Sequence, residues 1–263
     1  MYSFLIIIFF IFGTIIGSFL NVVTLRMHTG RTIGGRSFCF SCGKNLRWFE
    51  LIPVISFFMQ RGKCRRCKTG ISMQYPIVEI TTGLIFSLIA VYFFKVLPFS
   101  VGYFILLTGY FMVVFSFLIS IVVYDFHHKI IPNSLVYPLI IISIIGLFLP
   151  TGLNSIYASW YNIFAGIIIA IPFALIWLVS KGKWMGLGDP KLMLAMGTIL
   201  GFSSGVVSIV ISFWIAAIVG IGMIILKKAH RKTEVPFAPF LAIGFAIAFF
   251  CQLDIFSLLS FLS

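Results

Sequence analysis

The chain has 263 residues, of which 61% are hydrophobic and only 10% are charged, and its formal net charge is +13. Ordinary soluble domains contain about 25% charged residues, so the composition excludes a soluble globular protein and predicts a membrane protein that crosses the bilayer several times. Runs without Asp, Glu, Lys or Arg, each long enough for at least one helical span of about 20 residues, are residues 1–25, 96–124, 130–180, 192–226 and 235–253.

Glycine, proline and polar clusters divide the apolar parts of the chain into eight expected transmembrane helices. The first is expected to be a retained helix rather than a signal peptide, because no basic residue precedes it and no small-residue cleavage site is present. On this helix Gly13, Gly17 and Asn21 recur every four residues, which predicts close helix packing and a hydrogen bond. The spans are expected at residues 4–25, 77–94, 101–124, 135–149, 163–179, 190–200, 206–226 and 237–251.

Basic residues collect in the connections on one side of these helices. Residues 26–68 contain ten of the nineteen Lys and Arg residues and a single acid, Glu50. The other basic connections are 127–129, 181–191 and 227–232. Because positive loops remain in the cytoplasm, the N-terminus is expected outside and all basic loops inside. Topology and contact with anionic membrane lipid account for the net charge, so no nucleic-acid partner is expected.

One small module is expected on the cytoplasmic side between the first two spans, at residues 27–75. Its size is too small for a self-sufficient core, but CFSC at 39–42 and CRRC at 64–67 provide two CxxC pairs. Two such pairs favour a tetrahedral zinc ion. Two disulfides are the alternative, which a reducing cytoplasm disfavours. Four protein ligands close the metal site and predict a structural zinc, held by Cys39, Cys42, Cys64 and Cys67.

Two aspartates are expected at the cytoplasmic ends of separate helices. Asp125 lies at the end of the third span, in VVYDFHHKIIP, and Asp189 lies at the start of the sixth, in GLGDPK. Two buried carboxylates at equal depth can converge and share one proton, because mutual repulsion prevents both from ionising together. One then activates a water while the other, protonated, polarises a carbonyl, which is the chemistry of an aspartic protease.

Other interpretations of these two residues stay open. Asp189 would be a helix N-cap, and Asp125 would pair with Lys129 one helical turn later. A proton- or cation-coupled transporter is an alternative function, although transport sites usually lie near the membrane midplane. A second alternative function is that of a non-enzymatic assembly scaffold, which recruits partners through the cysteine module.

Four further residues are candidates for contact with a substrate. Gly186 and Gly188 lack a Cβ, so an extended peptide could approach their backbone closely. Lys191 stands close to Asp189 in sequence, and its alternative role is to reach the lipid headgroups. Glu79 lies in the first turn of the second span, where it is an interfacial acid and also suits the helix dipole.

The motifs together resemble those of the bacterial type IV prepilin leader peptidases, membrane aspartic proteases of the GxGD type. GSFLNVVTLR at 17–26 is similar to the opening motif of that family, and LIPVISFFMQRGKCRRC and ISMQYPIVE follow the first cysteine pair. Asp125, GLGDPKLM at 186–193 and VPFAPFLAIG at 235–244 extend the resemblance over almost the whole chain. One departure is Phe40, where the family often has proline.

The resemblance implies that Asp125 and Asp189 are catalytic and that the substrates are prepilins or pseudopilins. Their short basic leader would be removed at the cytoplasmic membrane face, just before an apolar helix. Many members with the cysteine module also methylate the new N-terminus with S-adenosylmethionine, an activity to which no residue is assigned. The implied location is the bacterial inner membrane.

Overall fold

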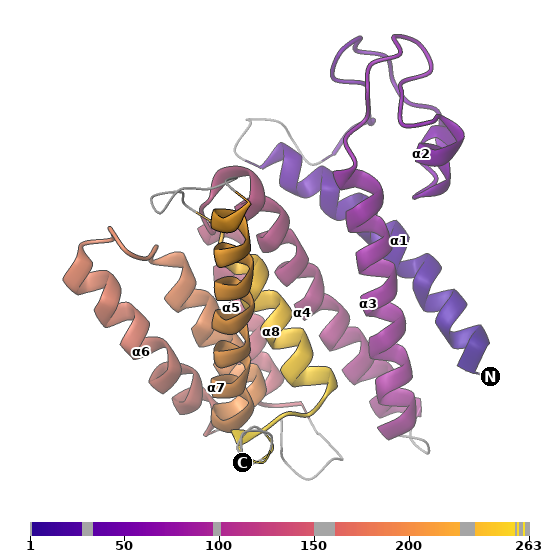
Figure 1. Ribbon diagram of the computed structural model, residues 1–263. Coiled ribbons are helices and arrows are strands. Elements are labelled where there is room, and N and C mark those ends of the chain that lie inside the picture. The colour runs from indigo at the N-terminus through magenta and orange to yellow at the C-terminus, as the bar shows by residue number, and fades with distance from the viewer. Residues whose placement is uncertain are drawn as a thin grey trace. The chain divides into compact units, whose positions relative to one another are not determined.

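The computed structural model describes residues 2–27, 34–96, 101–149, 161–226, 235–255, 257 and 260. In these residues the secondary structure is helical, apart from two isolated bridges, Phe38 with Asn45 and Lys63 with Gly70. The expected all-helical fold is therefore confirmed. The elements are α1 (Tyr2–Arg26), η1 (Trp48–Glu50), α2 (Ile55–Met59), α3 (Gln74–Val96), α4 (Val101–His128), α5 (Asn133–Gly146), α6 (Asn162–Ser180), α7 (Gly188–Ile225) and α8 (Ala238–Phe250), as Figure 1 shows.

Five of these helices, α1, α3, α4, α6 and α7, are long and apolar enough to cross a membrane, and α5 and α8 are shorter apolar helices. Each of the eight expected spans coincides with a helix, but the sixth and seventh both fall in α7. Gly201 breaks α7 between them, with a left-handed φ of 77° that only glycine adopts without strain. The expected basic connection at 227–232 lies outside the described residues.

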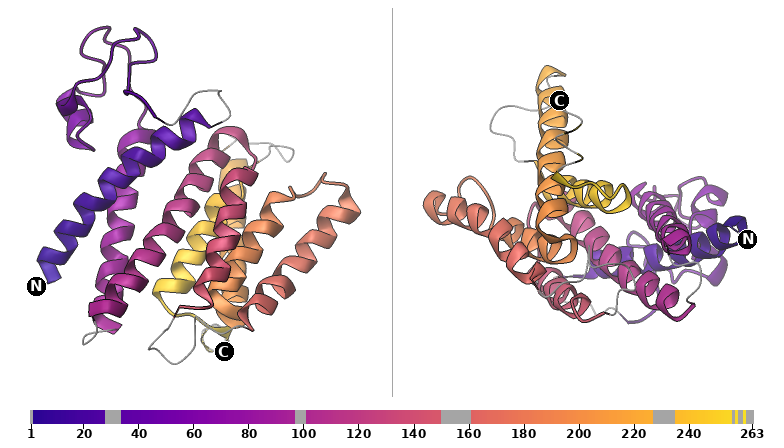
Figure 2. Two further views of the ribbon diagram at one scale, coloured as in Figure 1. Left: turned by 180° about the vertical axis from the view of Figure 1, so that it is seen from behind. Right: turned by 90° about the horizontal axis from the view of Figure 1, so that it is seen from below.

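The chain divides into two compact units, Met1–Val123 and Tyr124–Ser263, with the boundary inside α4. In the first unit α1 packs against α3 (Figure 2), and glycines lie at the contact. A Cβ on Gly13 would lie 2.7 Å from the Cα of Gly83, and one on Gly17 would lie 2.8 Å from the Cα of Glu79. The prediction of close packing along this face of the first helix is therefore confirmed.

Asn21 completes this contact with hydrogen bonds to the start of α3. Its Nδ2 donates to the Tyr75 carbonyl at 3.3 Å, and its Oδ1 accepts from Gln74 Nε2 at 3.3 Å. Asn21 is fully buried, where an unpaired amide would be costly. The expected hydrogen bond of Asn21 is thus present, and it fixes where α3 begins beside α1.

In the second unit α7 packs against α6, α8 and α5. Glycine again permits close approach, because a Cβ on Gly197 would lie 2.9 Å from the Cα of Gly166 in α6. The side chains of Leu192 and Met193 are completely buried just after the first turn of α7. This tight packing holds the beginning of α7, which carries Asp189, in a fixed position.

Candidate functional site

Asp125 and Asp189 lie on different helices of the second unit. Asp125 is in the last turn of α4 and is 4% exposed, and Asp189 is half-buried in the first turn of α7. The two carboxylates are close enough for the charge of Asp125 to act directly on Asp189. The two acids are 64 residues apart in the sequence. The fold therefore brings them within reach of each other's charge.

The carboxylate of Asp125 is oriented by the beginning of α8. Its Oδ2 accepts a hydrogen bond of 3.1 Å from the backbone N–H of Ala238, the first residue of that helix. The partial positive charge of a helix N-terminus favours a negative group there. This contact replaces the alternative ion pair with Lys129, whose backbone N–H instead bonds to the Asp125 carbonyl at 2.8 Å. Sequence reasoning missed Ala238, and the only signal was Pro239, a residue typical of a first helical turn.

Asp189 is held by the glycine turn that precedes it. The backbone N–H of Gly186 donates a hydrogen bond to its carboxylate. The N-cap of α7 is Leu187, and Asp189 lies inside the helix in the first turn. The alternative prediction that Asp189 is an N-cap is therefore wrong, because the helix begins one residue before it.

The two glycines of this turn have different surroundings. A Cβ on Gly188 would lie 2.6 Å from the Cβ of Ile131, so that space is already filled by the residue that precedes Pro132 and α5. A Cβ on Gly186 would lie 3.6 Å from its nearest neighbour, the Asp189 carboxylate, and Gly186 is exposed. Gly188 therefore serves internal packing, whereas Gly186 presents an open backbone beside the acid.

This difference predicts opposite results for two alanine substitutions. Gly188→Ala is expected to destabilise the protein by about 1–3 kcal/mol, because an overpacked site forces the backbone to move. Gly186→Ala is the matched control and should keep the thermal unfolding midpoint of the wild type. The clash at Gly188 involves the Cβ of Ile131, so adding Ile131→Ala should not rescue it. Equal midpoints for the two single variants would contradict this account.

Lys191 points its ammonium group toward α5. Its Nζ donates to Asn133 Oδ1 at 2.8 Å and to Tyr137 Oη at 3.0 Å, and it lies 4.7 Å from the centroid of the Tyr137 ring. These contacts tie the first turn of α7 to α5 and so help to position Asp189. Contact of Lys191 with a substrate stays a prediction.

Glu79 lies in the first unit, where its carboxylate joins α3 to the cysteine module. Its Oε2 accepts a hydrogen bond of 2.6 Å from the backbone N–H of Val54, the residue before α2. Ser18 of α1 also hydrogen-bonds to this carboxylate. Glu79 thus connects three segments of the first unit, and its role toward a substrate stays a prediction.

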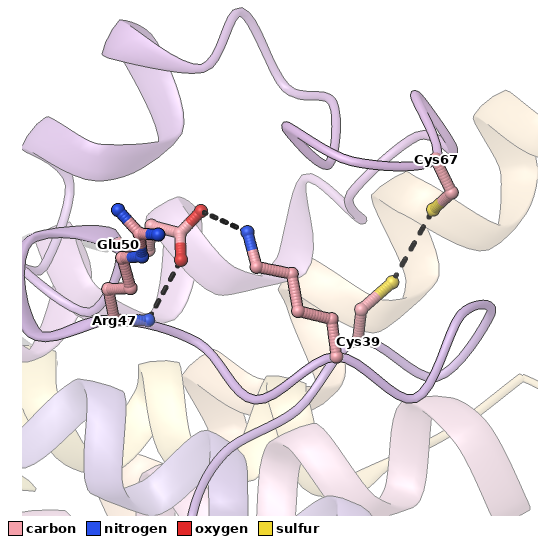
Figure 3. Close-up of polar contacts among 5 residues, drawn as sticks. Cys39, Arg47, Glu50 and Cys67 are labelled. Atoms are coloured by element: carbon pink, nitrogen blue, oxygen red, sulfur yellow. Dashed lines mark hydrogen bonds and ion pairs between the residues drawn. The ribbon is translucent and has the colours of Figure 1, made fainter.

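The four cysteines of the module gather at one point. Their sulfur atoms all lie within 4.8 Å of one another, and Cys39 Sγ is 3.7 Å from Cys67 Sγ (Figure 3). Two thiolates bound tetrahedrally to one zinc ion at 2.3 Å would be separated by about 3.8 Å. None of the four is in a disulfide. The cluster can therefore bind a metal, and its geometry fits a zinc module.

The two CxxC pairs lie in loops with the same backbone hydrogen bonds. Cys39 N–H donates to the Lys44 carbonyl and Cys64 N–H donates to the Thr69 carbonyl, both at 2.9 Å. The residue after each second cysteine is left-handed, with φ of 67° at Gly43 and 60° at Lys68. Each loop thus turns its two thiols toward the same side, as a shared metal ion requires.

A buried acid supports the first of these loops. Glu50 Oε2 accepts a hydrogen bond of 2.8 Å from the Arg47 backbone N–H, and its Oε1 lies 3.9 Å from Lys44 Nζ (Figure 3). An arginine backbone group and the lysine that follows the first cysteine pair thus both reach this acid. This contact links η1 to the metal-binding loop.

Two separate regions of the chain match known protein families. The description "Bacterial Peptidase A24 N-terminal domain" matches residues 11–93, and "Type IV leader peptidase family" matches residues 112–221. A protein named prepilin leader peptidase/N-methyltransferase from Bacillus subtilis (strain 168) is 33% identical over 92% of this chain and 92% of its own length. The chain belongs to the type IV leader peptidase family. A protein of the same name from Stutzerimonas stutzeri is 31% identical over 89% of this chain and 86% of its own. No solved structure is significantly similar.

The two regions that match the leader peptidase family contain different parts of the site. The N-terminal match includes the four cysteines and Glu79, and the second includes both aspartates. Ala238, which donates to Asp125, lies beyond both matches. The family membership thus covers the candidate acids and the metal cluster, and the structure adds the backbone group that orients one of the acids.

Proposed function

We propose that the protein is a membrane aspartic endopeptidase that removes the basic leader from prepilins or pseudopilins at the cytoplasmic membrane face. The proposal is supported by two acids at the ends of separate helices, Asp125 against the N-terminus of α8 and Asp189 in the first turn of α7, that lie within reach of each other's charge. Relatives over most of the chain are named prepilin leader peptidase/N-methyltransferase. The basic connections define the inner side, and the membrane is the bacterial inner membrane.

The mechanism requires one ionised and one protonated carboxyl group. The Ala238 N–H at the start of α8 favours negative charge on Asp125, so Asp125 is suited to take a proton from the attacking water. The water oxygen bonds to the scissile carbonyl carbon while protonated Asp189 donates to the carbonyl oxygen. The C–N bond then breaks as the leaving amine takes the proton from Asp125, and a hydroxyl proton of the intermediate returns to Asp189. Gly186 leaves open backbone beside Asp189 for an extended substrate.

The relatives' name also supports a second activity on the cleaved product. The new N-terminal amine would attack the methyl group of S-adenosylmethionine, lose a proton and release S-adenosylhomocysteine. No described residue is assigned to the methyl donor.

Cleavage by the purified protein in lipid nanodiscs tests the proposal. The substrate is a basic leader joined to an apolar helix, and the control joins the same leader to a soluble domain. Mass spectrometry should show one cut just before the apolar helix, and one added methyl group when S-adenosylmethionine is present. Absence of cleavage together with proton or cation flux in liposomes would favour the transporter.

We also propose that the metal of the cysteine cluster is a structural zinc ion, bound by Cys39, Cys42, Cys64 and Cys67. Four thiolates leave no open position for a substrate or water, so the ion would hold the two loops together. The exposed basic residues around the second pair, Arg65, Arg66 and Lys68 among them, offset the negative charge of a four-thiolate site.

The pH dependence of this metal site should depend on Thr69. A hydrogen bond between Cys67 and the Thr69 hydroxyl, together with one from the Thr69 backbone N–H, lowers the pKa of Cys67 from its ordinary value of 9.0 to about 6. A thiol with a lowered pKa contributes stability that is complete above its ordinary pKa and is lost as the pH falls through the lowered value. Since protons compete with metal for thiolates, Thr69→Val should move the midpoint of acid-induced zinc release to higher pH.

Zinc release can be followed with a coloured chelator during acid titration. Thr69→Ser is the matched control, because it keeps the hydroxyl, and should release zinc near the wild-type pH. Coincident midpoints for Thr69→Val and Thr69→Ser would show that the hydroxyl has no influence on the site.

A further inference from the structure

The segment from η1 through α2, residues 48–59, exposes an unusual amount of apolar surface. Trp48 is 77% exposed and Met59 is 68% exposed, and Leu51, Ile55 and Phe58 are also exposed. Single exposed apolar residues are common, but a cluster of large ones marks a surface that contacts a protein or a membrane. This η1–α2 segment belongs to neither the aspartate pair nor the cysteine cluster.

A hydrogen bond connects the segment to α3. Val54 N–H, immediately before α2, donates to Glu79 Oε2 at 2.6 Å. Glu79 is five residues into α3 (Gln74–Val96), a membrane-spanning helix, which corresponds to about 7.5 Å along its axis. The beginning of α2 therefore lies level with the end of a transmembrane helix.

The backbone at this point is strained. Val54 has φ 63° and ψ −56°, and Ile55 N–H bonds to the Pro53 carbonyl at 2.6 Å, which together define a tight γ-turn that is rare for a β-branched residue. Strain of this kind persists only where neighbouring contacts enforce it, and the bond to Glu79 is such a contact. Figures 1 and 2 show α2 closer to α1 and α3 than the tips of the cysteine loops are.

The lipid-exposed surface of α3 begins at the same level. Ile77, two residues before Glu79, is exposed, and Leu84 and Leu88 continue one side of the helix at helical spacing. A bilayer that covers Ile77 thus has its interfacial layer next to the beginning of α2. Tryptophan and amphipathic segments are typical of that layer.

The charge around the segment matches the same partner. Arg47 precedes it, and Arg61, Lys63, Arg65 and Arg66 follow it, all of them exposed. Basic side chains beside a membrane interface attract anionic headgroups. The module is also joined at both ends to spanning helices, α1 and α3, so a bilayer is always present at this level.

We propose that the η1–α2 segment lies in the interfacial layer of the protein's own membrane, with its apolar side chains inserted below anionic headgroups. The basic residues on either side contact those headgroups. The segment then fixes the module against the bilayer through lipid in addition to the two connections of the chain. This inference rests on the membrane spans and not on the proposed peptidase chemistry.

Fluorescence quenching in nanodiscs tests the proposal on the full chain. The Trp48 signal is the difference between wild type and Trp48→Phe, a variant that keeps an aromatic ring against Phe49. In nanodiscs rich in phosphatidylglycerol, lipids brominated near the headgroup should remove most of the Trp48 emission. Acrylamide in the aqueous phase should remove little of it.

The opposite pattern, strong quenching by acrylamide and none by brominated lipid, would overturn the proposal and leave the surface for a protein partner. Nanodiscs of phosphatidylcholine alone test the charge component, where brominated lipid should quench less. Arg61→Gln with Arg65→Gln should reduce the difference between the two lipids. Equal quenching of the wild type in both lipids would overturn the assignment of the basic residues to anionic headgroups.

Discussion

Asp189→Asn and Asp125→Asn are each expected to reduce prepilin cleavage by roughly 10²–10⁴-fold, the usual contribution of a positioned general acid or base. Asparagine keeps the shape of the side chain but can neither take nor release a proton. At position 125 its amide oxygen can still accept the Ala238 N–H, which bonds to Oδ2 in the structure. The loss should therefore appear in the rate constant of the chemical step, measured by single-turnover cleavage in nanodiscs.

A control is needed for structural damage at the same end of α7. Lys191→Met removes the ammonium that bonds to Asn133 and Tyr137 but leaves both carboxyl groups. It should lower activity less than either aspartate variant while also lowering the thermal midpoint. Aspartate variants that cleave at the wild-type rate would contradict the aspartic mechanism.

The helical architecture was predictable because long apolar segments of a membrane protein form helices that cross the lipid. Every expected span coincides with a helix, and the Gly13–Gly17 face packs as predicted. The place of the break in α7 was predictable, but its length was not. A run of glycine and serine at 201–205 indicates a connection by composition, whereas in the structure only Gly201 leaves helical geometry.

The chemistry of the candidate site was predictable only as far as residue types allow. The spacing of the cysteines predicts a shared metal ion, and the four thiols do gather. Backbone donors carry no such signature, so Ala238 as the partner of Asp125 could not be read from the sequence. The role of Gly188 could not be predicted from the sequence either. Its missing Cβ makes room for Ile131, and that neighbour is known only from the tertiary structure.

Cys64→Ser is expected to release the zinc ion and unfold the loops at residues 37–46 and 62–71. A module of this size cannot bury enough surface to remain folded by itself, and metal binding supplies its folding free energy. Cys64 is the buried member of the cluster, so a serine there leaves a hydroxyl where a thiolate ligand is needed. Zinc content should fall to near zero, and trypsin should cut at the basic residues of the second loop.

Cys251→Ser is the matched control, because Cys251 is exposed after α8 and lies outside the cluster. It should retain zinc and resist trypsin like the wild type. The aspartates belong to the other compact unit and contribute no metal ligand, so the Asp→Asn variants should also keep their zinc. If Cys64→Ser keeps its zinc and its resistance to trypsin, a structural zinc site is excluded. If, in cells, it abolishes pilin processing while both aspartate variants still support processing, the module acts as a scaffold and the aspartates are not catalytic.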